Sequence, residues 1–279
     1  MVIAAAFGNR LRKALQNFGV ARKSWTTSHV GHGEEPQWEI LTDMLEDVIA
    51  RRPARSIDEV VDLLNDIDAA LPATDGLKWF NHLYLSVTEA VRTAVVGGTW
   101  NDAPWLTQLD VVFANLYFDA LAAGSMDPDA APAAWTPVLA ARQDQGLKKI
   151  QFALAGMNAH INRDLPVAVI QTYLANSPGP DRAGARYADY ERVNAILETV
   201  EGQVKQQFMT GILGFVDAVN GPVDDVLAMW SIRAARDAAW THAELLWHLR
   251  HLPPLQRDFI RTLDGFAGFA GRGLLTHAG

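Results

Sequence analysis

Apolar residues recur every three or four positions along most of the chain, which is the spacing of one face of an α-helix. The clearest early segments are Glu39–Arg51, Ser56–Leu71 and Asp75–Val96. Gly, Pro, Ser, Asn and Asp cluster between such segments and mark their ends. By the same criteria we expect further helices at Ala103–Ala123, Ala133–Arg142, Gly146–Asn162, Pro166–Leu174, Tyr187–Phe215, Asp224–His251 and Leu255–Leu275.

The pattern predicts helices and no sheet. Alternating apolar and polar residues, which a half-buried strand would show, do not recur, and no Asn-Gly turn lies between β-branched segments. Ser56 and Glu59 form the Ser-x-x-Glu pattern of a capping box, which marks a helix start. We predict an all-α fold, a single multi-helix domain of the orthogonal-bundle type over residues 1–279.

Residues 1–36 are expected to form an N-terminal helix and a loop arm. The apolar face of this helix would pack against the body of the protein or against a second subunit of a homo-oligomer. Attachment to a membrane surface is the alternative. The basic residues follow the apolar start rather than precede it, unlike a secretory signal, and no segment has the apolar length needed to span a bilayer. The apolar face comprises Ile3, Phe7, Leu11, Leu15 and Phe18.

Composition narrows the class of protein. Hydrophobic residues make up 49% of the 279 positions and charged residues 20%, so a large core is available and global disorder is excluded. A net charge of −8 argues against nucleic acid as a partner, because no excess of Lys and Arg is available to neutralise phosphates. The chain has no cysteine, which excludes disulfides and cysteine nucleophiles and is compatible with the cytoplasm, where we expect the protein.

One predicted helix carries carboxylates inside an apolar segment. From Leu109 to Ala123 apolar residues occupy all sides, so this helix is expected in the middle of the fold. Asp110, Asn115 and Asp119 interrupt it, and a buried carboxylate needs a partner or a raised pKa. At about 100° per residue, Asn115 and Asp119 share a face, whereas Asp110 lies opposite Asp119. For each carboxylate, a structural pairing and a role in a site both remain open.

The densest group of polar residues lies between two apolar segments, within Gln151–Ile170. Ala153, Gly156 and His160 share a helix face, and the small residues would let another helix approach closely. An imidazole on such a packing surface needs a specific hydrogen-bond partner. His160 is therefore the leading candidate for a site residue.

Pro166 predicts a break in the helix that carries His160. Proline disfavours α geometry at the preceding residue, so we expect the helix to break near Arg163–Leu165 and a new one to start at Pro166. Asp164 would lie beside the new N-terminus, where a carboxylate is favoured. Asp164 thus has a structural explanation as well as a candidate role in a site.

A second histidine falls within an apolar stripe, in the segment Asp224–His251. His242 continues the line of Ile232 and Ala239, in a position where an apolar residue is expected. A lone core histidine is more often a packing residue than a ligand. Arg233 and Asp237 are four residues apart and could pair with each other. Another polar group, expected at the solvent face, comprises Asp237, Glu244 and His248.

Three other polar features give weaker indications. His82 falls off the apolar stripe of its helix, which includes Tyr84, and is expected at the solvent face. His29 and His32 have the spacing of metal ligands but lie in a glycine-containing loop. Asp224-Asp225 is better explained as a helix cap than as the Asp-rich motif of a terpene cyclase. Glycine-rich phosphate loops, Gly-x-Ser-x-Gly elbows and His-Glu-x-x-His motifs are absent.

With these residues identified, the sequence resembles DUF5995, an actinobacterial and fungal family of unknown function. The resemblance covers most of the chain after about residue 75, and it implies a shared fold but no particular reaction. It is carried by WFNHLYLSVTEAV (79–91), LDVVFANLYFDAL (109–121), QFALAGMNAHINRDLPVAV (151–169), and the DY-x-x-VN and AW-x-x-A-x-x-LW patterns at 189–194 and 239–247.

Our first functional hypothesis is an enzyme acting on a hydrophobic or aromatic small molecule. His160, Asp164 and His242, with Asp110 or Asp119, would converge inside the helical bundle. A His–Asp pair can perform acid–base chemistry. Alternatively, His160, Asp164 and His242 could ligate a divalent metal ion that activates water for hydrolysis.

The second hypothesis is a non-catalytic helical protein that binds a hydrophobic ligand or a partner. The same polar residues would then form a buried network that fixes how the helices pack. A terpene-cyclase-like enzyme is a third possibility, suggested only by the aromatic, all-α interior.

Overall fold

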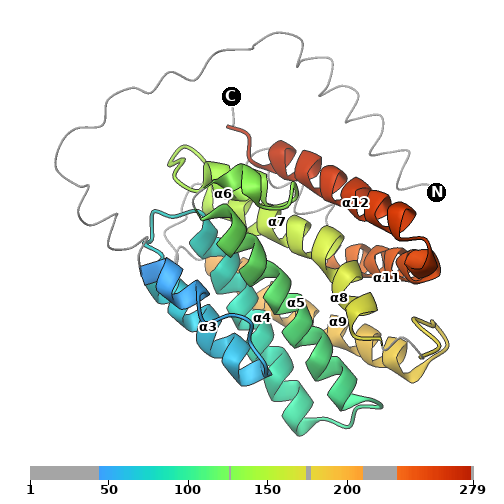
Figure 1. The fold of residues 1–279 in the computed structure, drawn as a ribbon. Coiled ribbons are helices and arrows are strands. Elements are labelled where there is room, and N and C mark those ends of the chain that lie inside the picture. The colour runs from blue at the N-terminus through green and yellow to red at the C-terminus, as the bar shows by residue number, and fades with distance from the viewer. Residues whose placement is uncertain (1–43, 126, 174–176, 210–230, 278–279) are drawn as a thin grey trace, which may run out of the picture. The chain divides into compact units, whose positions relative to one another are not determined.

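All secondary structure in the described part of the chain is helical (Figure 1). The structure, a computed structural model, describes residues 44–125, 127–173, 177–209 and 231–277. By its internal contacts the chain divides into Met1–Trp38 and Glu39–Gly279. The arm predicted for residues 1–36, including His29 and His32, and the Asp224-Asp225 pair lie outside the described residues.

The predicted all-α class is confirmed, and the helices begin and end close to the expected positions. Residues 44–49 are helical within the segment predicted at 39–51. The remaining α-helices are α3 (Ile57–Ala70), α4 (Leu77–Gly97), α5 (Ala103–Gly124), α6 (Thr136–Ala141), α7 (Lys149–Ala159), α8 (Leu165–Gln171), α9 (Ala185–Met209), α11 (Ile232–His248) and α12 (Pro253–Leu274).

Several helix starts follow from local side-chain capping. The Ser56 hydroxyl accepts a hydrogen bond from the Glu59 amide at 3.2 Å, as the capping-box pattern predicts. Glu59 Oε2 accepts in turn from the amide of Arg55, one residue earlier than in the standard box. Asp102 caps α5 by accepting from the Trp105 amide at 3.1 Å.

The helix break expected near Pro166 does not occur. Residues His160–Asp164 form a π-helical turn that joins α7 directly to α8, and the Leu165 amide donates to the His160 carbonyl. Proline lacks an N–H and its ring clashes with the carbonyl four residues earlier in an α-helix, so a wider turn accommodates Pro166 without ending the helix. Asp164 therefore does not cap a new helix, and its side chain is free to bond elsewhere.

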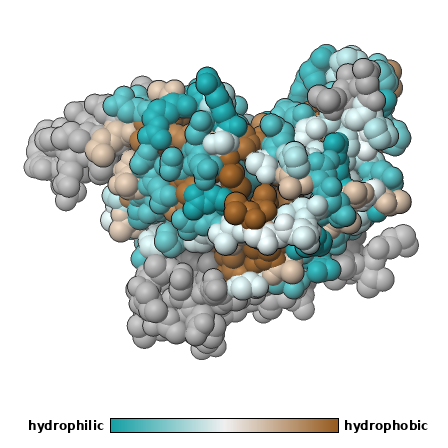
Figure 2. Space-filling view, turned by 90° about the horizontal axis from the view of Figure 1, so that it is seen from below, coloured by the Kyte–Doolittle hydropathy of each residue, from teal (hydrophilic) through white to brown (hydrophobic). Residues whose placement is uncertain are grey.

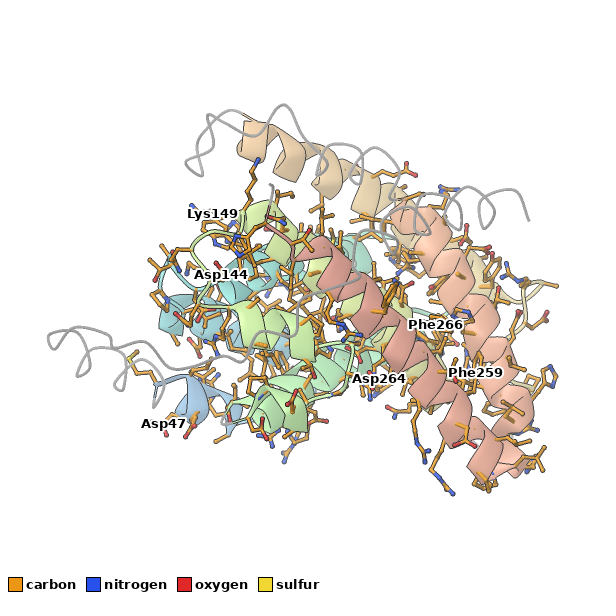
Figure 3. All side chains as sticks on the ribbon, turned by 90° about the horizontal axis from the view of Figure 1, so that it is seen from above. Asp47, Asp144, Lys149, Phe259, Asp264 and Phe266 are labelled. Atoms are coloured by element: carbon orange, nitrogen blue, oxygen red, sulfur yellow. The ribbon has the colours of Figure 1, made fainter. Side chains whose placement is uncertain are left out.

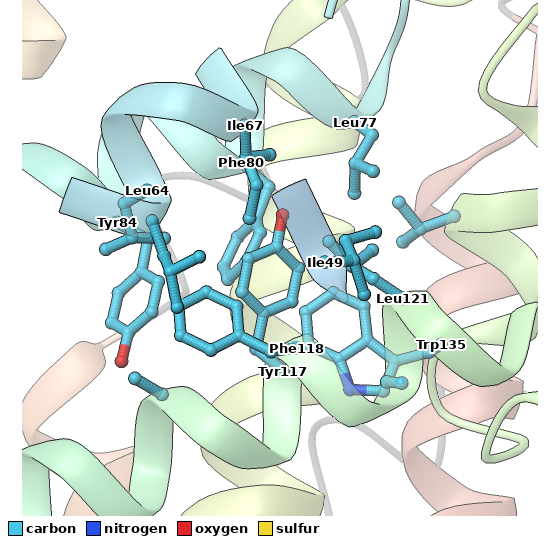
Figure 4. Close-up of a cluster of buried hydrophobic side chains, with 14 of the residues drawn as sticks. Ile49, Leu64, Ile67, Leu77, Phe80, Tyr84, Tyr117, Phe118, Leu121 and Trp135 are labelled. Carbon is cyan, nitrogen blue, oxygen red and sulfur yellow. The ribbon is translucent and has the colours of Figure 1, made fainter. Parts of the chain in front are cut away.

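The continuous α7–α8 rod lies at the centre of the helical arrangement. It contacts α4 and α5 on one side and α11 and α12 on the other (Figure 1). The close approach predicted for Gly156 is confirmed, because a Cβ atom there would collide with the Phe80 ring on α4. The largest core cluster lies nearby and brings together Phe80, Tyr117, Phe118 and Trp135 (Figure 4).

Helix α5 is less completely enclosed than its apolar sequence predicts. Its Asn115 side chain bonds both the amide and the carbonyl of Ala54, at 2.8 and 2.9 Å. Asp119 is largely exposed and accepts from Arg52 Nε at 3.1 Å. One edge of α5 therefore faces the short segment that precedes α3. This segment covers the edge only in part, so the rest of the edge is exposed to solvent.

Hydrophilic and apolar residues are unevenly distributed over the surface. The face seen in Figure 2 is mainly hydrophilic, with an apolar strip near its centre. Helix α12 also exposes apolar side chains, including Leu255 and Phe266, and Figure 3 labels Phe266 on this helix. None of the helices in the described segments has the length and apolar character needed to cross a membrane.

Candidate functional site

A cavity of about 100 Å³ lies between α4, α5, the π-helical turn, α9 and α11. Helical spacing explains how each helix contributes to it. Tyr84 on α4, Asp110 and Phe113 on α5, and His160 on the π turn line the cavity together with Arg236 on α11. The remaining described lining is apolar: Phe80, Leu83, Val87, Val91, Leu106, Leu109, Met157, Ile161, Leu165, Val193, Leu197 and Ile232.

Three residues that line this cavity each have a polar side-chain atom with no hydrogen-bond partner among the described residues. These atoms are the Tyr84 hydroxyl, Oδ2 of Asp110 and Nε2 of His160. Tyr84 is 6% exposed and His160 only 2%. Buried polar groups are almost always hydrogen-bonded, and these three atoms are exceptions within the described part of the chain.

His160 is held by a hydrogen-bond network on its other ring nitrogen. Nδ1 lies 2.9 Å from Oδ2 of Asp164, whose carboxylate also accepts from Trp135 Nε1 at 2.9 Å and from Arg163 at 2.6 Å. Trp135 and Arg163 both donate to this carboxyl group, so the tautomer of His160 that completes the network carries its proton on Nδ1. The lone pair of a neutral imidazole is then on Nε2, the atom without a partner.

Aromatic contacts fix the plane of the His160 ring. Phe113 stacks on it with ring centroids 3.5 Å apart and planes 7° from parallel. The Tyr84 ring meets it edge-on at 4.7 Å, and the Phe80 ring does so at 5.7 Å. These contacts leave the imidazole little freedom to turn, so Nε2 keeps its direction.

Burial changes the protonation of all three groups. Desolvation lowers the pKa of His160, although the hydrogen bond to Asp164 opposes the change. Burial, followed by the nearby Asp110 carboxyl, raises the pKa of Tyr84 well above its usual value. Burial also raises the pKa of Asp110 to about 7. Burial therefore favours the neutral imidazole of His160, the protonated phenol of Tyr84 and the protonated carboxyl group of Asp110, each relative to the same group in water.

Three of the five predicted site residues do not line this cavity: Asp164 contacts His160 from behind, whereas Asp119 and His242 lie elsewhere. Asp119 lies on the exposed side of α5, as expected from its position on the opposite side of the helix from Asp110. His242 packs edge-on against Phe259 of α12 at 5.8 Å, and Figure 3 shows Phe259 on that helix. Its Nδ1 has no partner in the described part of the chain, and desolvation lowers its pKa.

The proposed metal ligands His160, Asp164 and His242 do not form a ligand set. Nδ1 of His160 and both carboxylate oxygens of Asp164 are used in hydrogen bonds, and His242 faces α12. Within the described residues, no group of three or more His, Asp or Glu side chains is placed to hold a metal ion.

Two polar cavity residues do not stand out in the sequence. Tyr84 lies in the apolar stripe of its helix, and its hydroxyl does not interrupt the apolar spacing. Arg236 is 7% exposed and occupies the buried face of α11 that also includes Trp240 and Ala243. Arg236 lies four residues before Trp240, and this helical spacing is the feature of the sequence that indicates its burial. The apolar stripe through His242 lies instead at the edge of the buried face.

Other polar residues of the sequence are paired structurally. Arg233 lies 3.4 Å from Glu198, and Asp237 lies 2.6 Å from Arg182, so both residues have partners other than each other. His82 is partly exposed, with Nδ1 3.8 Å from Oδ1 of Asp68, and the nearby Asp68 carboxylate raises the pKa of His82.

Comparison with known proteins identifies a family but no characterised relative. No curated protein and no solved structure matches the chain. The model of a family of unknown function, DUF5995, matches residues 57–277, which include every described residue of the cavity. The match extends over most of the chain, and the protein therefore belongs to the DUF5995 family.

Proposed function

We propose that the protein is an acid–base enzyme and that the cavity around His160 is its active site. The observation that carries this proposal is that Tyr84, Asp110 and His160, each with an unpartnered polar atom, line one cavity whose remaining lining is apolar except for Arg236. Perturbed titratable groups in a cleft are typical of active sites. The apolar lining favours a small, largely apolar substrate that carries a carbonyl or hydroxyl group.

The three groups have complementary chemistry. Neutral His160 is suited to accept a proton at Nε2, with Asp164 as a positioning residue that stabilises the imidazolium formed. Protonated Tyr84 and Asp110 are suited to donate hydrogen bonds to a substrate oxygen. Such a site favours removal of a proton from the carbon beside a carbonyl, with the enol oxygen hydrogen-bonded by Tyr84 or Asp110. The same Nε2 could instead activate a water molecule for hydrolysis.

Nucleophilic catalysis receives less support. The described lining contains no Ser, Thr or Lys side chain next to His160 that could form a covalent intermediate. The small cavity also favours a compact substrate over a prenyl diphosphate.

Proton transfer can be tested without knowledge of the natural substrate. Cyclopentanone in D₂O should exchange its α-protons faster with the protein than without it, as measured by NMR. His160→Gln should reduce the protein-catalysed rate at least about 100-fold, since general bases contribute rate factors of about 10²–10⁴. His242→Gln, outside the cavity, is the matched control and should leave the rate unchanged.

The alternative is a ligand-binding protein without catalysis, which the small, mostly apolar cavity also favours. Cyclopentanone would then bind, as judged by saturation-transfer NMR, without accelerated exchange. Equal exchange rates for the wild type and His160→Gln, in the presence of binding, would reject the enzyme in favour of this alternative.

A further inference from the structure

Arg236 is a buried cation at the α11 side of the cavity. Its Nε donates to Asn194 Oδ1 at 2.8 Å, and its Nη2 donates to the Tyr190 carbonyl at 2.8 Å. The guanidinium lies 4.0 Å above the Tyr190 ring. The hydroxyl of Tyr190 donates to the Arg236 carbonyl at 2.7 Å. These contacts hold the guanidinium in a fixed place between α9 and α11.

All of these partners are neutral. Two other arginines with little exposure pair directly with carboxylates: Arg142 with Asp75 at 2.5 Å and Arg163 with Asp164 at 2.6 Å. Arg236 is 7% exposed, yet no described carboxylate lies within ion-pair distance of it. Arginine is rarely buried without a charged partner, because an uncompensated buried charge costs several kcal/mol.

The remaining nitrogen is the one available to a ligand. Nε and Nη2 are used by Asn194 and Tyr190, and Nη1 has no hydrogen-bond partner in the described segments. Arg236 lines the same cavity as Tyr84, Asp110 and His160. A molecule bound there can therefore supply the missing negative charge.

We propose that the cavity binds small carboxylic acids as their anions, with the carboxylate at Arg236 and the apolar remainder against the aliphatic and aromatic lining. This inference rests on the cavity of the proposed function and names its substrate class. Guanidinium–carboxylate hydrogen bonds are charge-assisted and stronger than neutral ones. A short branched or cyclic acid suits the volume, and its functional group would point towards His160.

The test compares isobutyrate with isobutyramide, which have nearly the same shape but differ in charge. In NMR titrations of the full-length wild type, isobutyrate should bind at least about 10-fold more tightly, in keeping with the strength of charge-assisted hydrogen bonds. Arg236→Met should abolish the preference for isobutyrate, and Arg236→Lys should retain part of it. Arg233→Met is the matched control, because Arg233 lies on the same helix and pairs with Glu198 at the surface.

Equal affinities of the wild type for the two molecules would overturn the inference, and so would an unchanged preference in Arg236→Met. The comparison of isobutyrate with isobutyramide on the wild type tests the inference even if Arg236→Met does not fold. Failure of this inference is separate from failure of the proposed function. Cyclopentanone exchange depends on His160 and reports on proton transfer, whereas the preference for isobutyrate depends on Arg236 and reports on the anion.

Discussion

The protonation of Asp110 makes the stability of the folded protein depend on pH. In the folded protein its pKa is about 7, whereas an ordinary aspartate has a pKa of 3.8. Between these values the folded state holds a proton that the unfolded chain has released, so the Asp110 contribution to stability falls as pH rises. Below pH 3.8 both states are protonated, and above pH 7 both are ionised.

We expect Asp110→Asn to remove this dependence. Between pH 5 and 6.5 the free energy of unfolding of the wild type should fall, relative to the variant, by about 1.4 kcal/mol per pH unit. Urea denaturation followed by circular dichroism measures the difference at each pH. Parallel stability profiles for the two proteins would show that Asp110 is not protonated in the folded state.

Asp164 and Asp119 provide a matched pair of aspartates with opposite environments. Asp164 is fully buried and accepts from His160, Trp135 and Arg163, whereas Asp119 pairs with Arg52 at the surface. Asp164→Asn should lower the free energy of unfolding by about 3 kcal/mol, because the amide cannot accept from all three donors. Asp119→Asn should change it by no more than about 0.5 kcal/mol. Similar losses in the two variants, measured in urea, would contradict the assigned environments.

At the scale of elements, the contact between α4 and α7 depends on the absence of a side chain. An added Cβ at Gly156 would overlap the Phe80 ring, which also lines the cavity. We expect Gly156→Ala to lower stability by about 2 kcal/mol through overpacking. Gly265→Ala, at an exposed position of α12 with no atom within 4 Å of the new Cβ, should instead raise stability by about 0.5–1 kcal/mol.

Thermal unfolding of both glycine variants provides the measurement. The two substitutions add the same methyl group to a helix, so helix propensity favours both equally. A stabilised Gly156→Ala variant would mean that Phe80 can move away and that the helix contact is not tight.

The helices themselves follow closely from local sequence. The apolar spacing and the Ser56 cap predicted most helix ends to within a few residues, because capping and amphipathicity are local properties. The error at Pro166 has a local cause as well. Pro166 is incompatible with uninterrupted α geometry, whereas a π turn accommodates the proline and lets the helix continue.

At the scale of the whole molecule, the cavity combines residues separated by more than 150 positions. Tyr84, Asp110, His160 and Arg236 come from different helices, and each lies on the inward face of its own. The sequence identified His160 and Asp110 as polar residues in apolar surroundings. It also suggested Asp119 and His242, which the packing directs elsewhere.

The sequence by itself determined the helical class, the places where helices start and stop, and the apolar context that sets His160 and Asp110 apart. Hydrophobic periodicity assigns a residue to a face of its own helix, and this is a property of the local chain. Only the tertiary structure decided which faces meet. The pairing of His160 with Asp164, the stacking on Phe113 and the burial of Arg236 without a carboxylate depend on contacts between distant segments, which no local pattern encodes.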